Sequence, residues 1–146
     1  MATSAKNVKV INGTHGFLTR NGMPWAEVTA FQLKLSKKKE AYNLCCGDMM
    51  EHHKTNSVSG TGSVEFYKVD SGTMAEDMQI LDGHDHYDTL VGALADPDAE
   101  GAERVAAKGV NFDDIPISDW KAGANGKITR AFTFEGIQLL DLIPVR

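Results

Sequence analysis

Cysteine is scarce in this chain, and long hydrophobic runs are absent. The two cysteines among the 146 residues, Cys45 and Cys46, are adjacent, and adjacent Cα atoms are about 3.8 Å apart, less than a disulfide usually spans. We therefore expect synthesis in a reducing, cytosolic compartment. No apolar run approaches the roughly 20 residues of a membrane-spanning helix, and the polar start MATSAKN lacks the hydrophobic segment of a signal peptide. Stable membrane association and export by a cleaved signal are not expected.

Positive charge is also in short supply. Lysine and arginine number 15 against 20 acidic residues, a formal net charge of −5, and the one basic tract is Lys37–Lys39. Proteins that grip nucleic acid carry a basic patch or stripe, so tight binding of this kind is not expected. A chain of 146 residues with 42% apolar composition has room for one ordinary core, which predicts a single domain over residues 1–146.

Two β-hairpins are predicted in the first half of the chain. The first begins with Gly16–Arg20 and turns at Asn21-Gly22, a two-residue sequence typical of hairpin turns. The second is long: Glu27–Ser36 forms one arm, Lys37–Lys39 a solvated tip, and Glu40–Cys45 the returning arm. Polar and apolar residues alternate along the first arm, which is typical of a strand with one buried and one solvent-exposed face. So long a hairpin has too little chain around it to be covered, and its apolar face and open edge need a neighbour.

A polar loop of small residues, His53–Gly62, is expected to follow and to lead into a strand that ends at Val69. The helix is expected to start at Thr73, because Thr73 and Glu76 have the spacing of a capping box. The helix is expected to stop at Asp82-Gly83. Further strands are expected at residues 87–95, 104–112 with a bulge at Gly109, 127–135 and 137–145. Residues 127–135 alternate, with Ile128, Arg130, Phe132 and Phe134 on one side of the strand. The fold class is therefore mainly β with one short helix, arranged as an antiparallel β-sandwich or barrel with a long extended hairpin.

The histidines raise the question of a metal site. The pair His52-His53 and the segment that contains His84 and His86 supply imidazoles of the kind that bind zinc. The spacing places no third ligand, so exposed loop histidines are the favoured interpretation, and no metal, cofactor or catalytic residue is predicted. Cys45 lacks the flanking motif of a cysteine enzyme and is interpreted as a small buried or half-buried residue. The alternative is a small metal-dependent enzyme that uses His84, His86 and one or both of His52 and His53.

Four segments occur in the order known from one protein family: 13–22, 53–69, 103–113 and 132–136. Together they resemble the phage tail tube proteins of PBSX-like defective prophages and contractile-tail bacteriocins. The resemblance implies a tail-tube-like β-sandwich or barrel without enzymatic activity. It also implies that the subunits form hexameric rings, which stack as the inner tube of a contractile tail inside a sheath. A second alternative within this architecture is a type VI secretion-like tube protein.

The resemblance also implies partners and a location. The partners are further copies of the chain, the tail sheath protein, and the tape-measure and baseplate proteins, and DNA passes transiently through the channel. Assembly is expected in the bacterial cytoplasm, and the product is part of a virion tail or a released tail-like particle. An N-terminal arm, residues 1–12, and the loop over 47–59 are the candidates for contacts between rings.

The candidate residues at subunit interfaces are Phe31, Leu33, Leu35, Tyr42, Leu44, His53, Lys54, Ser59, Gly60 and Gly62. The loop that contains the two glycines is expected to dock on another subunit. Valine at both glycines is therefore predicted to hinder polymerisation more than it lowers the stability of the monomer.

Overall fold

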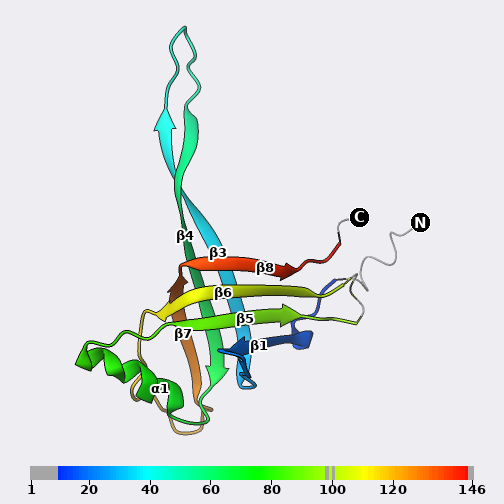
Figure 1. Cartoon of the computed structure of the whole chain (residues 1–146), viewed down its shortest axis with the longest axis vertical. Helices are drawn as coiled ribbons and strands as arrows, with labels where there is room; N and C mark the ends of the chain where they lie inside the picture. The colour runs from blue at the N-terminus through cyan, green and yellow to red at the C-terminus, as the bar shows by residue number, and fades with distance from the viewer. Residues whose placement is uncertain (1–9, 98, 100, 145–146) are drawn as a thin grey trace.

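A computed structural model describes residues 10–97, 99 and 101–144 (Figure 1). Most of the predicted arm, residues 1–9, and two acidic residues of the turn after residue 95, Asp98 and Glu100, lie outside the described residues. The strands are β1 Gly16–Arg20, β2 Met23–Pro24, β3 Val28–Tyr42, β4 His52–Tyr67, β5 Asp88–Leu94, β6 Glu103–Phe112, β7 Lys127–Phe134 and β8 Gly136–Asp141. The helical elements are η2 Gly13–His15, α1 Gly72–Asp77 and η3 Met78–Asp82.

Every strand pairing in the described chain is antiparallel, and the strands follow the order β2-β1-β5-β6-β7-β4-β3, with β8 pairing β6. Strand β6 connects two groups of strands, because it pairs with β5 and β8 and then, through Asn111 and Phe112, with β7. In Figure 1 the strands β1, β5, β6 and β8 run across β3, β4 and β7. The sheet does not close, so the expected β-rich class with one short α-helix is confirmed in an open, sandwich-like form.

The predicted bulge in β6 is confirmed. Asp88 pairs with Val110, whereas Leu90 pairs with Ala107, so β6 contains one residue more than β5 at this point. Gly109 has a φ of +66°, a left-handed conformation that glycine adopts without a steric penalty. The bulge lies just before the two residues of β6 that pair with β7, where a bulge increases the local bend and twist of a strand.

The core lies where the two groups of strands face each other. Along β7 the buried positions alternate, as the sequence predicts: Arg130, Phe132 and Phe134 are buried, and the residues between them are exposed. The buried hydrophobic cluster comprises Leu18, Val64, Phe66, Leu90, Ala107, Val110, Phe132 and Phe134. Of Val64, Phe66 and Tyr67, the residues that the sequence offers to anchor β4 in the subunit's own core, the first two do so, whereas Tyr67 is 41% exposed.

The long hairpin differs from its predicted form. Lys37–Lys39 is not a tip, because β3 continues through it to Tyr42, and the chain turns back over residues 43–51. The returning arm is β4, so residues 53–62, predicted as a loop, are part of a strand. In this part of the hairpin both strand faces are exposed. Lysines and small polar residues are therefore accommodated without ending the strand.

The short helix also differs in its start. It begins at Gly72 with Ser71 as the N-cap residue, so Thr73 lies inside the first turn and makes no capping box. Glu76 instead forms an ion pair with Arg20 of β1. The predicted end is confirmed: after η3, Gly83 has a φ of +86°, the left-handed conformation that commonly ends helices.

Candidate assembly surfaces

The hairpin of β3 and β4 projects beyond the rest of the subunit (Figure 1). The pairing of β4 with β7 stops at Gly60 and Phe134, so the part beyond is a two-stranded ribbon in the described chain. Both edges of such a ribbon present unpaired N–H and C=O groups, which are ready to pair with another chain. An isolated two-stranded hairpin is marginal in water. A neighbouring molecule would therefore stabilise it.

Polar contacts organise the end of the hairpin. His52 Nε2 lies 2.7 Å from Asp48 Oδ2, and the backbone N–H of Met50 donates to Asp48 Oδ1 at 3.0 Å. These two interactions, the first being larger, hold the pKa of Asp48 below its ordinary value. The ring of Tyr42 stacks on that of His52, with centroids 5.5 Å apart. The turn is thereby tied to the last cross-strand pair of the hairpin.

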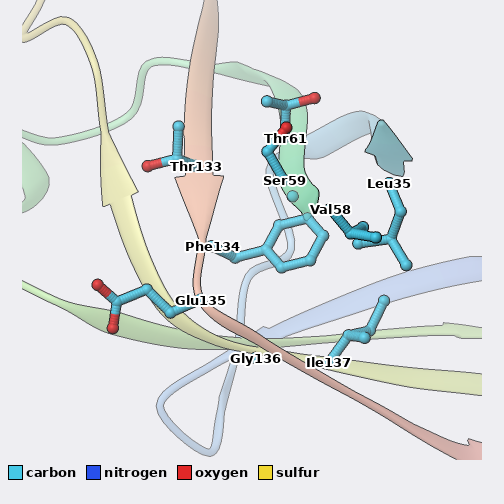
Figure 2. A pocket seen from close by; sticks show the side chains of 10 residues that line it. Leu35, Val58, Ser59, Thr61, Thr133, Phe134, Glu135, Gly136 and Ile137 are labelled. Carbon is cyan, nitrogen blue, oxygen red and sulfur yellow. The ribbon is translucent and has the colours of Figure 1, made fainter. Parts of the chain in front are cut away.

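A shallow groove lies where the hairpin leaves the body (Figure 2). Its volume is about 570 Å³. The apolar part of its lining is Leu35, Val58, Phe134 and Ile137, and Ser59, Gly60 and Thr61 complete the hairpin side. Three of the predicted interface residues, Leu35, Ser59 and Gly60, thus meet at one place. Tyr42, Leu44, His53 and Lys54 lie farther along the exposed hairpin and its turn.

The remaining interface candidates have roles inside the subunit. Phe31 and Leu33 pack against the buried cluster. At Gly60 an added Cβ would overlap the ring of Phe134, and at Gly62 it would overlap the ring of Phe132 and the backbone oxygen of Gln32. Valine at either position is therefore expected to destabilise the monomer, because the two glycines make room for core side chains. The predicted larger effect on polymerisation stays a prediction.

A second exposed surface was not identified from the sequence. In the described chain β8 pairs with β6 alone, which leaves its other edge open. Its apolar residues are exposed on both faces, with Ile137 at 40%, Leu139 at 58% and Leu140 at 39%. Apolar side chains along an open edge mark a contact site. The signal in the sequence was the largely apolar segment from Ile137 onward, which was interpreted only as a strand.

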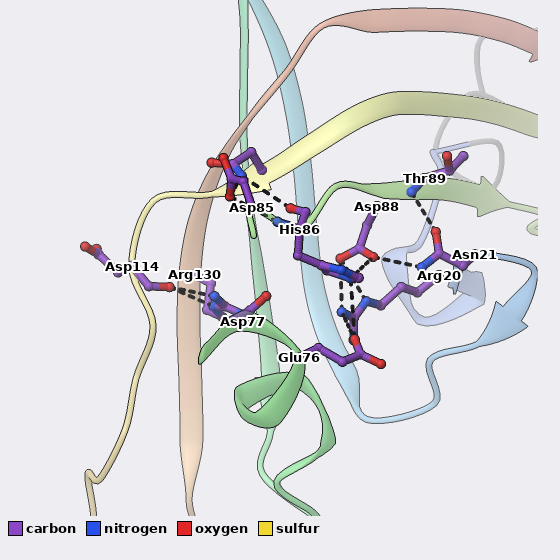
Figure 3. Close-up of polar contacts among 11 residues, drawn as sticks. Arg20, Asn21, Glu76, Asp77, Asp85, His86, Asp88, Thr89, Asp114 and Arg130 are labelled. Atoms are coloured by element: carbon purple, nitrogen blue, oxygen red, sulfur yellow. Dashed lines mark hydrogen bonds and ion pairs between the residues drawn. The ribbon is translucent and has the colours of Figure 1, made fainter. Parts of the chain in front are cut away.

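A polar network fastens α1 to the sheet (Figure 3). Arg20 Nη2 lies 2.7 Å from Glu76 Oε2 and 3.0 Å from Asp88 Oδ2. His86 Nε2 lies 2.8 Å from Asp88 Oδ1, which also accepts from the side-chain amide of Asn21 at 2.8 Å. Asp88 is fully buried, so its charge depends on these partners. Residues far apart in sequence form the network, and no local motif indicated it.

Arg130 anchors the opposite side of α1. Its side chain is 2% exposed, and Nη1 lies 2.7 Å from Asp77 Oδ2. The guanidinium also donates to the backbone oxygen of Asp114 from Nε and Nη2, and it lies 4.1 Å from the centre of the Phe112 ring. This buried charge is fully engaged, which indicates a structural role.

The metal-site alternative finds no support in this geometry. His52 pairs with Asp48 at the end of the hairpin, whereas His86 pairs with Asp88 beside α1. Within the described ranges no three His, Cys, Asp or Glu side chains are grouped so that they could hold a metal ion. Cys45 and Cys46 are exposed, so the interpretation of Cys45 as a buried or half-buried residue is wrong. The cysteines lie in the turn of the hairpin, where no core is available to cover them.

No helix in the described part of the chain is long and apolar enough to cross a membrane.

The open sheet with its projecting hairpin is shared with chains of solved contractile-particle structures. One solved structure that shares it is an anti-feeding prophage cap, with a TM-score of 0.69, 8% identity, and coverage of 91% of this chain and 92% of that chain. Another is the sheath–tube complex of an extracellular contractile injection system in its extended state, with a TM-score of 0.67, 7% identity, and coverage of 97% and 99%.

The chain belongs to the phage tail tube protein family, whose model matches residues 3–141. It is 35% identical over 138 residues to the phage-like element PBSX protein XkdM of Bacillus subtilis strain 168, covering 92% of each chain. It is also 37% identical over 120 residues to the uncharacterized protein YqbM of the same strain, covering 81% of this chain and 80% of that protein. The resemblance is confirmed, and a structural role in a tail tube follows. The type VI and metal-enzyme alternatives are not favoured.

Proposed function

We propose that this chain is the inner-tube subunit of a contractile phage tail or phage-tail-like bacteriocin, acting as one domain. Copies form hexameric rings, and the rings stack around a central channel inside a sheath. The observation that carries this proposal is the projecting hairpin with unpaired edges on a subunit of the tail tube family. Such a subunit leaves backbone groups and apolar side chains that a second copy can satisfy.

Two open edges support the formation of a ring. In the described chain β3 pairs on one side with β4, and β8 pairs on one side with β6. Contacts between different edges of successive copies are heterologous, and such contacts close into a ring when the rotation between copies divides a full turn. We therefore assign β8 and β3 to contacts within the ring.

The hairpin supports the stacking of rings. Leu35, Ser59 and the exposed residues toward its end, among them Tyr42 and Leu44, are assigned to contacts between rings, together with His53 and Lys54. The residues of the turn, 43–51, belong to the same surface. The predicted arm, residues 1–12, stays a separate candidate for contacts between rings. Phe31, Leu33, Gly60 and Gly62 shape the base of the hairpin from inside the subunit.

The proposed partners follow from this role. A tube inside a contractile tail contacts the sheath, a tape-measure protein in the channel and the baseplate at its end, and DNA passes through it transiently. Assembly takes place in the bacterial cytoplasm, before the particle leaves the cell. Chains that share the fold occur in a solved sheath–tube complex and in a solved baseplate, which supports the sheath and the baseplate as partners.

Negative-stain microscopy of the purified chain over a concentration series tests the proposal. We expect rings or hollow rods to appear as the concentration rises. The double variant Leu35→Ser and Leu44→Ser should lose rods, whereas Leu81→Ser should keep them, because Leu81 is an exposed apolar residue outside the hairpin. A wild-type chain that stays monomeric at high concentration would contradict the proposal.

A further inference from the structure

The charges of this chain are unevenly distributed between the hairpin and the rest. Residues 28–60 contain five lysines and three acidic residues, a formal charge of +2 in a chain of −5, which leaves −7 for the remainder. Four of the lysines, Lys37–Lys39 and Lys54, lie on the projecting ribbon, and no ion pair within the described chain involves them. The ribbon itself, residues 36–59, contains these four lysines and three acidic residues, a formal charge of +1. We call Lys37–Lys39 and Lys54 the basic band.

The connector between β6 and β7, residues 113–126, has the opposite character. Asp113, Asp114 and Asp119 are exposed, and their carboxylates take part in no ion pair among the described residues. With Lys121 as its single basic residue, the connector carries a formal charge of −2. Its first part is anchored to β7, because Arg130 donates to the backbone oxygen of Asp114. The connector thus presents a positioned acidic surface.

The connector also contains an exposed tryptophan, which directly follows Asp119. Trp120 is 84% exposed, whereas Trp25, the only other tryptophan, packs against Phe66. Tryptophan is enriched among the residues that dominate interface energies, and its ring face attracts ammonium groups. An exposed indole that follows a carboxylate residue in the chain is suited to bind lysine side chains.

The two surfaces cannot meet within one copy. Lys38 pairs with Ser57, whereas Tyr67, at the other end of β4, pairs with Lys127, the residue after the connector. The other end of the connector lies level with Ser63, because the backbone N–H of Asp113 donates to the oxygen of Ala131, which pairs with Ser63. The strand from Ser57 spans roughly 20 Å to Ser63 and roughly 33 Å to Tyr67. The basic band and the acidic connector therefore lie toward opposite ends of the β3–β4 axis, as heterologous contact between stacked copies requires.

We propose that the basic band of one copy docks on the Trp120 connector of a second copy in the next ring. This inference rests on the proposed function and names the acceptor surface for the hairpin. Charge complementarity identifies the occupant. The formal charge of −7 outside residues 28–60 repels a polyanion. A second copy instead supplies carboxylates without ion pairs and an exposed indole. The lysine ammonium groups pair with the carboxylates, and the indole is covered by the lysine stems.

A charge-swap experiment tests the pairing. The variants are K37E/K38E/K39E, D113K/D114K/D119K and the sixfold combination, each compared with wild type by sedimentation and negative-stain microscopy at 0.05 M salt. Each single-surface reversal should reduce the polymer roughly ten-fold or more, and the combination should restore most of it. Asp82→Lys is the control for reversing the charge of a surface carboxylate, because Asp82 is exposed and lies outside the connector. Thermal unfolding of each dilute monomer checks that the fold is retained.

Trp120 supplies an independent readout. In a W25F background, emission should shift to shorter wavelength as the chain polymerises, because the indole leaves water. Failure of the combined variant to recover, or unimpaired single-surface variants, would overturn the pairing while leaving the proposed function standing. If the lysine variant K37E/K38E/K39E keeps its rods but retains less DNA than wild type, the proposed pairing would also be overturned, in favour of a polyanion partner. Absence of rods from the wild-type chain would contradict the proposed function itself.

Discussion

Replacing Gly62 with alanine should destabilise the monomer even though the residue lies at the base of an assembly element. The added Cβ would overlap the backbone oxygen of Gln32 and the ring of Phe132, which is 1% exposed. Neither the oxygen nor the ring can move aside without disturbing the hydrogen bonds between β3 and β4 or the packing of the core. Overpacking of this kind costs about 1–3 kcal/mol, and we expect a value near the top of that range. For a domain of this size, such a loss lowers Tm by roughly 5–10 °C.

Urea unfolding of the dilute monomer, followed by tryptophan fluorescence, measures this loss. Gly60→Ala should cost less, about 1 kcal/mol, because the obstructing Phe134 ring borders the groove and has space to turn. Gly136→Ala is the matched control: it is a strand glycine whose added Cβ would make only ordinary contact, 3.6 Å from Lys108 Cβ. Equal unfolding midpoints for Gly62→Ala and Gly136→Ala would show that a Cβ at position 62 is accommodated without overpacking.

Two further predictions concern charged groups. Asp77→Ala should lower the free energy of unfolding by about 3–5 kcal/mol, because it leaves the buried guanidinium of Arg130 without its carboxylate; a loss below 1 kcal/mol in urea titrations would count against a buried pair. In the folded chain the pKa of Asp48 lies below its ordinary 3.8 through His52. The stabilisation of the turn is therefore complete above pH 3.8 and lost as pH falls through the lower folded pKa. Carboxyl NMR titration should find that pKa raised toward 3.8 in His52→Ala, and an unchanged value would exclude His52 as the cause.

Local patterns in the sequence were sufficient for several elements. Asn21-Gly22 turns the first hairpin with φ angles of 52° and 85°, because these two residue types tolerate positive φ. The alternation along residues 127–134 correctly placed the buried face of β7. Both features depend on interactions within a few residues, which a sequence pattern records directly.

The long hairpin and the polar networks depend on distant partners. Residues 53–62 resemble a loop by composition, yet β3 on one side and, near Gly60, β7 on the other supply their ladder hydrogen bonds. Arg20 and Asp88 lie 68 residues apart in the chain. No local signal links them. The candidate surface on the hairpin was therefore predicted as a region, while its register, its groove and the open edge of β8 required the structure.

The most direct test of the tube assignment is a reconstruction, from electron micrographs, of the polymer formed by the full chain. We expect stacked rings with six copies each around an open channel. The β8 and β3 edges should lie at contacts within a ring, and the hairpin should reach the next ring. A polymer without a channel, or rings in which the hairpin projects free into solvent, would contradict it.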